Sequence, residues 1–323
     1  MREALCDRFG RRITTLRVSV TDRCNLRCRY CMPAGGVRLS PRAALLCFEE
    51  IAQVVAAAAD LGVYRIKLTG GEPLLRRDLE RLVAMIAAIA SIEDLSLTTN
   101  GTLLAPLGRA LRDAGLQRVT VSLDTLRRER FRRVTGGDLK AVLAGIEAAD
   151  RAGLAPIKIN VVALRGVNDD EFSDFARLTL DRPIEVRFIE LMPIGHCASV
   201  GPEHFMPAAE VRDRLQAIGA LVPVVSSSWS GPAQRFRFAG ARGTVGFIAP
   251  ITEPFCERCN RLRLTSHGVL RACLLAGGEV ALKPALRPRP DGEALRAAFR
   301  DAVALKPARH AGRGVTPMSL IGG

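Results

Sequence analysis

The sequence predicts an α/β protein whose parallel strands form an incomplete (βα)6 barrel of the TIM type, followed by a C-terminal extension. Short β-like runs alternate with amphipathic helical stretches from about residue 13 to residue 220, the pattern of a parallel sheet covered by helices. The strands alternate polar and apolar side chains, and the repeat stops near residue 220. We therefore expect a barrel domain over residues 1–220 and an extension over residues 221–323.

Six strands and six helices are expected in the repeat. The strands cover residues 14–20, 64–68, 94–98, 118–123, 156–162 and 184–190. The helices cover residues 48–61, 78–90, 104–114, 139–152, 169–180 and 208–219. The extension holds β-like runs at residues 234–238, 244–248 and 261–265 and a helix at residues 292–302. The intervening helices favour this parallel arrangement over the alternative, a single antiparallel sheet with one face in water.

Within each predicted strand, side chains of one parity are polar and those of the other parity are apolar. The polar set consists of Arg17, Ser19, Arg65, Lys67, Ser96, Thr98, Thr120, Ser122, Lys158, Asn160 and Arg187. A closed eight-stranded barrel fills its interior with branched apolar side chains, so the pattern does not predict one. We expect the apolar face to pack on helices and the polar face to line a chamber for a large, charged ligand.

Composition limits the class of protein. The chain has 323 residues, of which 48% are hydrophobic and 25% charged, as in folded globular proteins. Its apolar stretches end before the roughly 18 residues that would predict a membrane span, and residues 1–12 do not resemble a secretory signal. We expect a cytoplasmic protein without a membrane partner. The net charge of +14 favours anionic partners, but only 5 of 47 basic residues are lysine, and we do not expect nucleic-acid binding from charge alone.

Three cysteines, Cys24, Cys28 and Cys31, lie in a CxxxCxxC run directly after the first strand. Three thiolates this close can ligate three irons of a 4Fe–4S cluster, whereas a closed cluster takes four cysteines. The fourth iron would be open to a substrate group, as the open position is in catalytic metal sites. For an isolated triplet, the alternatives are a zinc site with a distant fourth ligand or three unrelated thiols.

A Thr-Gly-Gly-Glu-Pro run at residues 69–73 follows the second strand, and Tyr30 precedes the third cysteine. The two glycines let the main chain approach a ligand closely. Together these motifs resemble the signature and the S-adenosylmethionine (SAM) binding motif of the radical SAM superfamily. The resemblance implies that SAM chelates the open iron and is cleaved to a 5′-deoxyadenosyl radical. It implies SAM contacts from Tyr30, Gly71, Ser122 and Met192, at the barrel rim where active sites lie.

A second group of cysteines, Cys256, Cys259 and Cys273, has the spacing CxxC-x13-C in the extension. One interpretation is a Cys3His zinc site completed by His267, and the other is a second 4Fe–4S cluster with one open iron. Arg261 and Arg263 follow at once, where two guanidinium groups on one side of a short strand could bind phosphates in bidentate fashion.

The radical SAM motifs, the CxxC-x13-C spacing, the Arg-x-Arg pair and the terminal Gly322-Gly323 together resemble the GTP 3′,8-cyclase family (molybdenum cofactor biosynthesis protein A) over residues 11–323. The resemblance implies a lyase that converts GTP to (8S)-3′,8-cyclo-7,8-dihydroguanosine 5′-triphosphate, the first step of molybdopterin synthesis. It implies two 4Fe–4S clusters, the second of which binds guanine, and a glycine tail that enters the chamber. No catalytic side chain beyond the cluster and substrate ligands is implied.

Carried over position by position, the resemblance implies a set of GTP contacts: Arg17, Lys67, Thr98, Lys158, Arg261, Leu262 and Arg263. The family usually has arginine at the position of Lys67, so the positive charge is kept but a bidentate phosphate contact is not. The remaining cysteines match no motif and are expected to be ordinary thiols: Cys6, Cys47 and Cys197.

The resemblance also implies a homodimer, an external electron donor, and transfer of the product to cyclic pyranopterin monophosphate synthase. Two other functions are consistent with parts of the sequence. A radical SAM protein that modifies a peptide would usually have more than three C-terminal cysteines. A zinc-containing nucleic-acid-binding protein would lack iron and SAM, and its affinity would fall steeply with salt.

Overall fold

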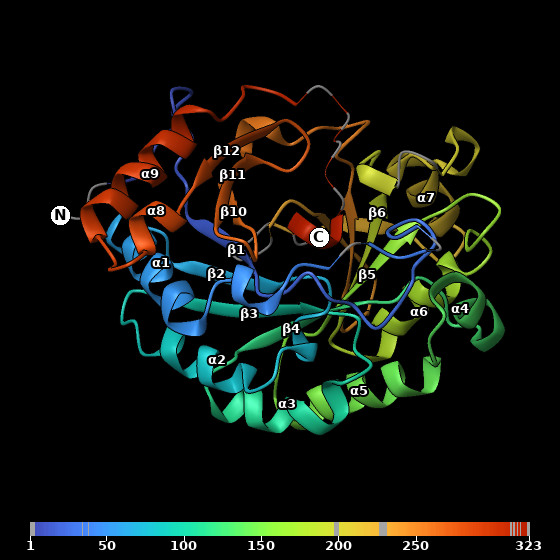
Figure 1. Ribbon diagram of the computed structural model, residues 1–323. Coiled ribbons are helices and arrows are strands. Elements are labelled where there is room, and N and C mark those ends of the chain that lie inside the picture. The colour runs from blue at the N-terminus through green and yellow to red at the C-terminus, as the bar shows by residue number, and fades with distance from the viewer. Residues whose placement is uncertain are drawn as a thin grey trace.

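The computed structural model describes residues 4–33, 35–37, 39–196, 200–225, 231–310, 312, 314, 316 and 318–321. Its centre is a curved sheet of six parallel strands that pair in sequence order (Figure 1). These strands are β1 (Thr15–Ser19), β2 (Arg65–Thr69), β3 (Asp94–Thr99), β4 (Arg118–Ser122), β5 (Lys158–Ala163) and β6 (Glu185–Glu190). The six predicted strands and the incomplete barrel are confirmed.

Helices cover the outer side of this sheet (Figure 1). The predicted ones are α1 (Phe48–Asp60), α2 (Leu79–Ala87), α3 (Leu104–Asp113), α5 (Leu139–Arg151), α6 (Phe172–Asp181) and α7 (Ala208–Leu215). A further helix, α4 (Arg128–Thr135), was not predicted, because its buried face is only Phe131, Val134 and Thr135 within a strongly charged segment. None of the helices in the described ranges combines the length and the apolar character that crossing a membrane would require.

The apolar side chains of the barrel strands point outward and form one core with the helices. Leu16 and Val18 on β1 and Ile66 on β2 are fully buried, as are Ile51 and Val54 of α1, in the same cluster. Burying this face removes most of the apolar area of the strands from water, which is the main contribution to the stability of such a sheet. The predicted direction of the apolar parity is therefore confirmed, and the polar parity faces the interior of the barrel.

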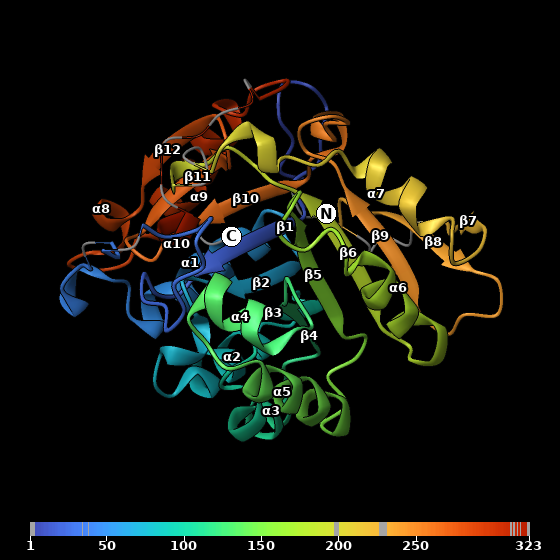
Figure 2. The same cartoon turned by 90° about the vertical axis from the view of Figure 1, so that its right-hand side faces the viewer.

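The extension adds strands to both edges of the barrel sheet. On one side β9 (Thr244–Ile248) pairs in parallel with β6, followed outward by β8 (Gln234–Phe238) and β7 (Leu221–Pro223). On the other side β10 (Arg261–Leu264) pairs in parallel with β1, followed by β11 (Val269–Cys273) and β12 (Gly277–Ala281). Figure 2 shows these two groups on opposite sides of the barrel. The chain continues through α8 (Lys283–Leu286), α9 (Gly292–Ala304) and α10 (Met318–Ile321).

The runs that form β8, β9 and β10 were predicted as extended, but β7, β11 and β12 were not. Strand β7 has only three residues, and β12 begins with two glycines that have little strand propensity. More importantly, the partner of each edge strand lies far away in the sequence. A local pattern predicts that a segment is extended, but it does not predict which distant strand it pairs with.

Candidate functional site

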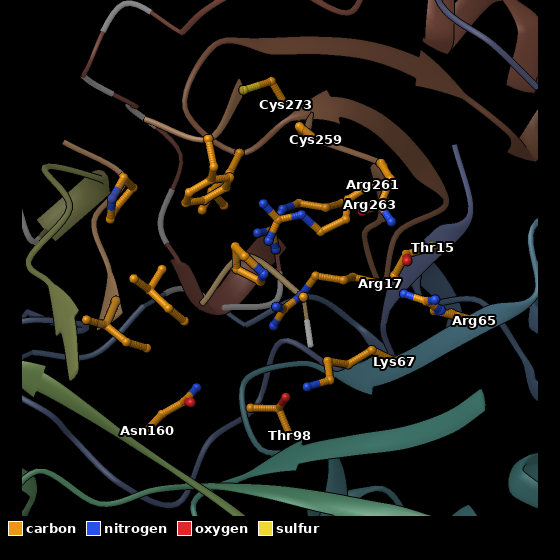
Figure 3. Close-up of a pocket in the computed structure, with 18 of the residues that line it drawn as sticks. Thr15, Arg17, Arg65, Lys67, Thr98, Asn160, Cys259, Arg261, Arg263 and Cys273 are labelled. Atoms are coloured by element: carbon orange, nitrogen blue, oxygen red, sulfur yellow. The ribbon is translucent and has the colours of Figure 1, made fainter. Parts of the chain in front are cut away.

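The polar faces of the strands line a cavity of about 230 Å³ inside the barrel (Figure 3). From the predicted polar set, the lining residues are Arg17, Arg65, Lys67, Ser96, Thr98, Lys158, Asn160 and Arg187. Ser19, Thr120 and Ser122 of that set are not among them. The predicted polar chamber is confirmed, and it receives further residues from the extension, including all three cysteines of the second group.

Strand register brings basic side chains together on one wall of the cavity. Arg263 on β10, Arg17 on β1 and Lys67 on β2 are direct partners across three adjacent parallel strands. Arg261 lies two residues before Arg263 and lines the same cavity (Figure 3). Leu262, between these two arginines, has the opposite parity, and its side chain is fully buried in the apolar core. Any contact of Leu262 with a ligand in the cavity is therefore through its main chain.

Burial and mutual repulsion weaken the cationic forms of these side chains. Burial, followed by the charge of Arg261, lowers the pKa of Arg17 to about 9. Burial and the charge of Arg17 lower the pKa of Lys67 well below its usual value. Burial and the charge of Arg187 lower the pKa of Lys158 to about 7. A polyanionic ligand would relieve this repulsion and restore the ordinary charge of the cluster.

Two neutral polar atoms in the cavity are buried without a partner. Oγ1 of Thr98 and Oδ1 of Asn160 have no hydrogen-bond partner among the described residues. Buried polar atoms are almost always hydrogen-bonded in folded proteins, so such atoms in a lined cavity point to a ligand. Thr98 was a predicted contact, whereas Asn160 was predicted only as a member of the polar face.

Two carboxylates hold cations of the cavity wall, Asp94 within the lining and Glu185 behind it. On β6, Glu185 lies between Arg187 Nε, at 2.5 Å, and Lys158 Nζ, at 3.7 Å. Asp94 on β3 accepts two hydrogen bonds from the guanidinium of Arg118 on β4. These carboxylates offset part of the positive charge that the cations on β4, β5 and β6 bring to the cavity.

The first group of cysteines lies on the loop that follows β1. The carbonyl of Cys28 accepts hydrogen bonds from the main-chain nitrogens of Cys31 at 2.8 Å and Met32 at 2.9 Å, which makes a tight turn. Burial raises the pKa of Cys28 well above its usual value, and the negative charges of Asp124, Cys31 and Cys24 add to it. The three thiols are thus close enough to interact electrostatically. Such a set of soft donors fits a 4Fe–4S cluster with one open iron.

The two glycines after β2 allow two loops to touch. A Cβ atom on Gly71 would lie 2.3 Å from the carbonyl oxygen of Arg23, and one on Gly70 would lie 2.8 Å from that of Thr21. The Gly71 nitrogen donates to the Thr21 carbonyl at 2.8 Å. The glycines were predicted to let a ligand approach the main chain, and the close approach in the structure is to the segment that leads into Cys24.

The glutamate of the same motif is buried and fixes the start of the neighbouring loop. Oxygens of Glu72 accept hydrogen bonds from Leu74 N at 3.0 Å, Thr99 Oγ1 at 2.7 Å and Asn100 N at 2.7 Å. Burial raises the pKa of Glu72 to about 7 despite these hydrogen bonds. The side-chain nitrogen of Asn100 in turn lies 3.9 Å from Cys24 Sγ. Glu72 therefore acts on the first cysteine site through the loop after β3.

Of the predicted SAM contacts, Tyr30 has a partner that was not predicted. Its hydroxyl donates to Oδ2 of Asp124 at 2.6 Å, and Asp124 follows Ser122 just beyond the end of β4. Asp124 is buried, and its Oδ1 accepts from the main chain of Val162. The position of Asp124, directly beyond the end of a predicted strand, was the signal in the sequence that could have indicated its role. Met192, after β6, lines the cavity and packs near the second cysteine site.

The three cysteines of the second group line the cavity, and Figure 3 shows Cys259 and Cys273 across it from Thr98 and Asn160. Cys256 and Cys259 lie in and directly after a short 3-10 turn (Cys256–Arg258), and Cys273 ends β11. Burial raises the pKa of Cys259, but the positive charges of Arg261 and Lys306 outweigh it and bring the pKa to about 6. A thiolate at neutral pH is the form that ligates metals.

His267, the possible fourth ligand of a zinc site, is engaged elsewhere. Its Nε2 lies 2.6 Å from Ser40 Oγ, and it does not line the cavity. Across the ranges that the structure describes, no three His, Cys, Asp or Glu side chains are arranged to hold a single metal ion. The three-sulfur set that lines the cavity fits an iron–sulfur cluster with one open iron.

Two buried charged residues, neither of them predicted, hold the loop of the second site. Oxygens of Glu190 accept from the main-chain nitrogens of Ala208 at 3.0 Å, Ile251 at 2.9 Å and Thr252 at 3.0 Å. Arg11 donates to the carbonyls of Cys256 at 2.7 Å, Pro307 at 2.7 Å and Ala308 at 3.1 Å. The partners of both residues are distant in sequence, so no local pattern indicates these contacts.

The remaining predicted positions are accounted for as follows. Gly322, Gly323 and Cys197 lie outside the described residues. Earlier tail residues return to the barrel: Gly314 pairs with the segment after β6, and Ile321 is buried beside Met192. Cys6 and Cys47 are exposed free thiols, and Cys47 caps α1 by accepting from Glu50 N at 3.4 Å.

Comparison with known proteins gives two family matches. Residues 18–179 match the radical SAM superfamily, and residues 184–312 match the family described as Molybdenum Cofactor Synthesis C. The GTP 3′,8-cyclase of Moorella thermoacetica is 50% identical over 322 residues, covering 98% of this chain and 99% of the relative. That of Pelotomaculum thermopropionicum is 51% identical over 323 residues, with coverages of 98% and 99%.

Among solved structures, Streptococcus suis SuiB bound to the precursor peptide SuiA is similar with a TM-score of 0.60 at 14% sequence identity. The match covers 90% of this chain but spans only 64% of that chain. SuiB bound to S-adenosylmethionine gives a TM-score of 0.58 at 13% identity, covering 91% of this chain and 71% of that one. At these identities the likeness shows a shared fold.

Proposed function

This chain belongs to the GTP 3′,8-cyclase family of radical SAM enzymes, and from that membership we propose how its residues divide the work of the reaction. The enzyme is a lyase that cyclises GTP to (8S)-3′,8-cyclo-7,8-dihydroguanosine 5′-triphosphate in molybdenum cofactor synthesis, and it uses SAM and iron–sulfur chemistry. The observation that carries this function is identity near 50% to GTP 3′,8-cyclases over almost the whole chain.

We propose that Cys24, Cys28 and Cys31 hold one 4Fe–4S cluster. SAM is proposed to contact Tyr30, Gly71, Ser122 and Met192. When bound, the reduced cluster supplies the electron that cleaves SAM. The protein's part is to hold the cysteine loop in place, through the docking of the glycine motif and the Tyr30–Asp124 hydrogen bond. This fixed geometry limits the freedom of the bound reactants, which lowers the entropic barrier to reaction.

We propose that GTP binds on the basic wall. The proposed contacts are Arg17, Lys67, Thr98, Lys158, Arg261, Leu262 through its main chain, and Arg263. Two observations support these contacts: the row of cations that strand register brings together, and the oxygen of Thr98 that has no hydrogen-bond partner within the described part of the chain. Lys67 donates to Thr120 Oγ1 at 3.0 Å, so it can offer a point charge to a phosphate but not the fork of an arginine.

We propose that Cys256, Cys259 and Cys273 would hold a second 4Fe–4S cluster, whose open iron would offer a binding position to the guanine. In this division, residues 1–220 form the radical SAM barrel and residues 221–323 form the extension that carries the second cluster and the glycine tail. The two edge pairings of the extension bring the second site over the cavity that the barrel lines.

We further propose that the enzyme works in the cytoplasm as a homodimer, receives electrons from an external donor, and passes its product to cyclic pyranopterin monophosphate synthase. These proposals rest on the family membership alone. Sedimentation analysis of the reconstituted enzyme tests the dimer, and a coupled assay with the synthase tests product transfer.

The test of the site assignment is anaerobic reconstitution, followed by metal analysis and turnover. We expect about eight irons per chain, as two 4Fe–4S clusters require, and GTP-stimulated rather than ATP-stimulated formation of 5′-deoxyadenosine. The double variant Arg261→Ala/Arg263→Ala should still cleave SAM but should not cyclise GTP. Arg258→Ala, an exposed neighbour in the same loop, is the control and should behave as the wild type. Undiminished cyclisation by the double variant would refute the phosphate assignment.

A further inference from the structure

Lys306 is a buried amine beneath the second cysteine site. Only 1% of the surface of Lys306 is exposed, although lysine is almost always at the protein surface. It follows the C-terminal end of α9, and its Nζ donates to the carbonyl oxygens of Arg261 at 2.9 Å and Ala272 at 2.8 Å. These two carbonyls belong to β10 and β11, which are neighbours in an antiparallel hairpin. One side chain therefore links two neighbouring strands of the extension by hydrogen bonds.

The tied positions are the ones that carry the cysteines. Arg261 comes two residues after Cys259, and Ala272 directly precedes Cys273. A shift of either carbonyl away from Nζ would move the attached cysteine with it. The hydrogen bonds of Lys306 thus fix the separation of Cys259 and Cys273, the two ligands on either side of the x13 segment.

A buried ammonium group usually has a negatively charged partner, and the two hydrogen-bond acceptors of Lys306 are neutral carbonyls. Cys259, Cys273 and the positively charged Arg261 lie close enough to act on its charge. Burying an ammonium group without a negative partner is costly, and a methionine would fill the same space at lower cost. A metal cluster held by Cys259 and Cys273 would supply the negative charge that such a buried cation needs.

We propose that Lys306 is a positioning residue of the second site, which holds Cys259 and Cys273 at the spacing that the cluster needs and stabilises the cluster's reduced form with its positive charge. The inference rests on the proposed assignment of Cys256, Cys259 and Cys273 as cluster ligands. Reduction adds a negative charge to a cluster, and a buried cation nearby favours that charge because the local dielectric constant is low. Charge and hydrogen bonding around the sulfurs are general determinants of cluster potential.

Two substitutions separate the two roles. Lys306→Met keeps the volume but removes both the donors and the charge, whereas Lys306→Gln keeps an N–H donor pair without the charge. Lys283→Met is the matched control, because Lys283 also donates to a main-chain carbonyl, that of Ala44 at 2.7 Å, but lies on α8 and does not line the cavity. Circular dichroism of each apoprotein establishes that it folds.

Two quantities are measured after anaerobic reconstitution. One is the iron content per chain, and the other is the reduction potential of each cluster, monitored by electron paramagnetic resonance. The signal that changes when SAM is added belongs to the first cluster, and the other belongs to the second. We expect Lys306→Met to lose up to half of the iron and to shift the potential of the second cluster to more negative values, with the first cluster unchanged. Lys306→Gln should regain iron but keep the shifted potential, and Lys283→Met should match the wild type.

Unchanged iron and potential in Lys306→Met would overturn the inference, and so would equal shifts in both clusters. Failure of both Lys306 variants to fold would also overturn it, because the lysine would then support the fold in general. These outcomes differ from failure of the site assignment, since in that case the wild type itself would bind only one cluster, or zinc, at reconstitution.

Discussion

The hydroxyl of Tyr30 donates to Oδ2 of Asp124 at 2.6 Å, and this contact joins the first cysteine loop to the carboxyl end of β4. The loop follows β1, and β1 is separated from β4 by two strands in the sheet. The hydrogen bond therefore spans the rim of the barrel and connects Tyr30 with the strand that carries Ser122. The two proposed SAM contacts hold their relative positions because of one buried carboxylate.

Asp124→Ala is expected to weaken SAM binding by about ten- to a hundredfold, since a hydrogen bond to a charged group contributes roughly 1.5–3 kcal/mol. Tyr30→Phe removes the same hydrogen bond from its other end. The two effects should therefore not add in the double variant. Equilibrium binding of SAM to the reconstituted enzyme measures this cycle, and strictly additive losses would show that the contact does not position the SAM site.

Gly71→Ala should prevent the first cysteine loop from docking, because its Cβ would lie 2.3 Å from the Arg23 carbonyl, where backbone cannot easily yield. We expect a loss of stability of at least about 1–3 kcal/mol, the usual cost of overpacking, and loss of the iron of the first cluster. Calorimetry and iron analysis test this. Gly35→Ala is the control, since no described atom lies within 4 Å of its added methyl group, and it should melt like the wild type.

Glu190→Gln should destabilise the protein even before clusters are bound. The glutamate oxygens accept hydrogen bonds from Ala208 N, Ile251 N and Thr252 N, and an amide would turn a donor toward at least one of them. Leaving buried donors unpaired costs about 1–3 kcal/mol each, so we expect a loss of roughly 3 kcal/mol. Urea unfolding of the apoprotein measures it, with the exposed Glu257→Gln as control. Equal midpoints for the two variants would contradict the role of Glu190.

Triphosphate binding should weaken as pH rises above about 7. The pKa of Lys158 in the free protein is about 7, and an anion beside it raises this pKa. Binding therefore takes up a proton above pH 7, and the dissociation constant should rise by up to about tenfold per pH unit over the next one to two units. Calorimetric titration with GTP in buffers of different ionisation enthalpy measures the proton uptake.

Lys158→Met should remove this pH dependence, and a slope that persists in the variant would assign it to another group. The stability of the free protein should change with pH in the opposite direction to GTP binding. The unfolded chain keeps Lys158 protonated up to about pH 10.4, so unfolding takes up a proton between about pH 7 and pH 10. Stability of the wild type relative to Lys158→Met should therefore increase with pH over this window.

Local sequence patterns predicted much of this architecture for a physical reason. The alternation on strands such as β1 and β2 reports which face is buried, and a buried face must be apolar wherever it lies in the fold. The same alternation directs Arg17, Lys67 and Lys158 to the interior of the barrel, where they line the cavity. Short motifs such as CxxxCxxC act within one loop, so they too are recognisable from a few residues.

Contacts between distant segments could not be predicted in this way. Arg11, Glu190 and Lys306 look like ordinary charged residues in the sequence, and their functions depend on partners brought together only by folding. The pairing of β10 with β1 and of β9 with β6 is a property of the whole sheet. These interactions connect the extension to the barrel, and they are the part of the site that no local pattern indicates.

The position of β10 beside β1 has a consequence during synthesis of the chain. The first strand to leave the ribosome obtains one of its two neighbours only after most of the protein has been made. Until then, the edge of β1 has unpaired main-chain groups that invite pairing with other chains. We expect a slow, late step in folding, as is typical of contacts between distant segments. A chain that stops before residue 261 should aggregate rather than accumulate as a free barrel.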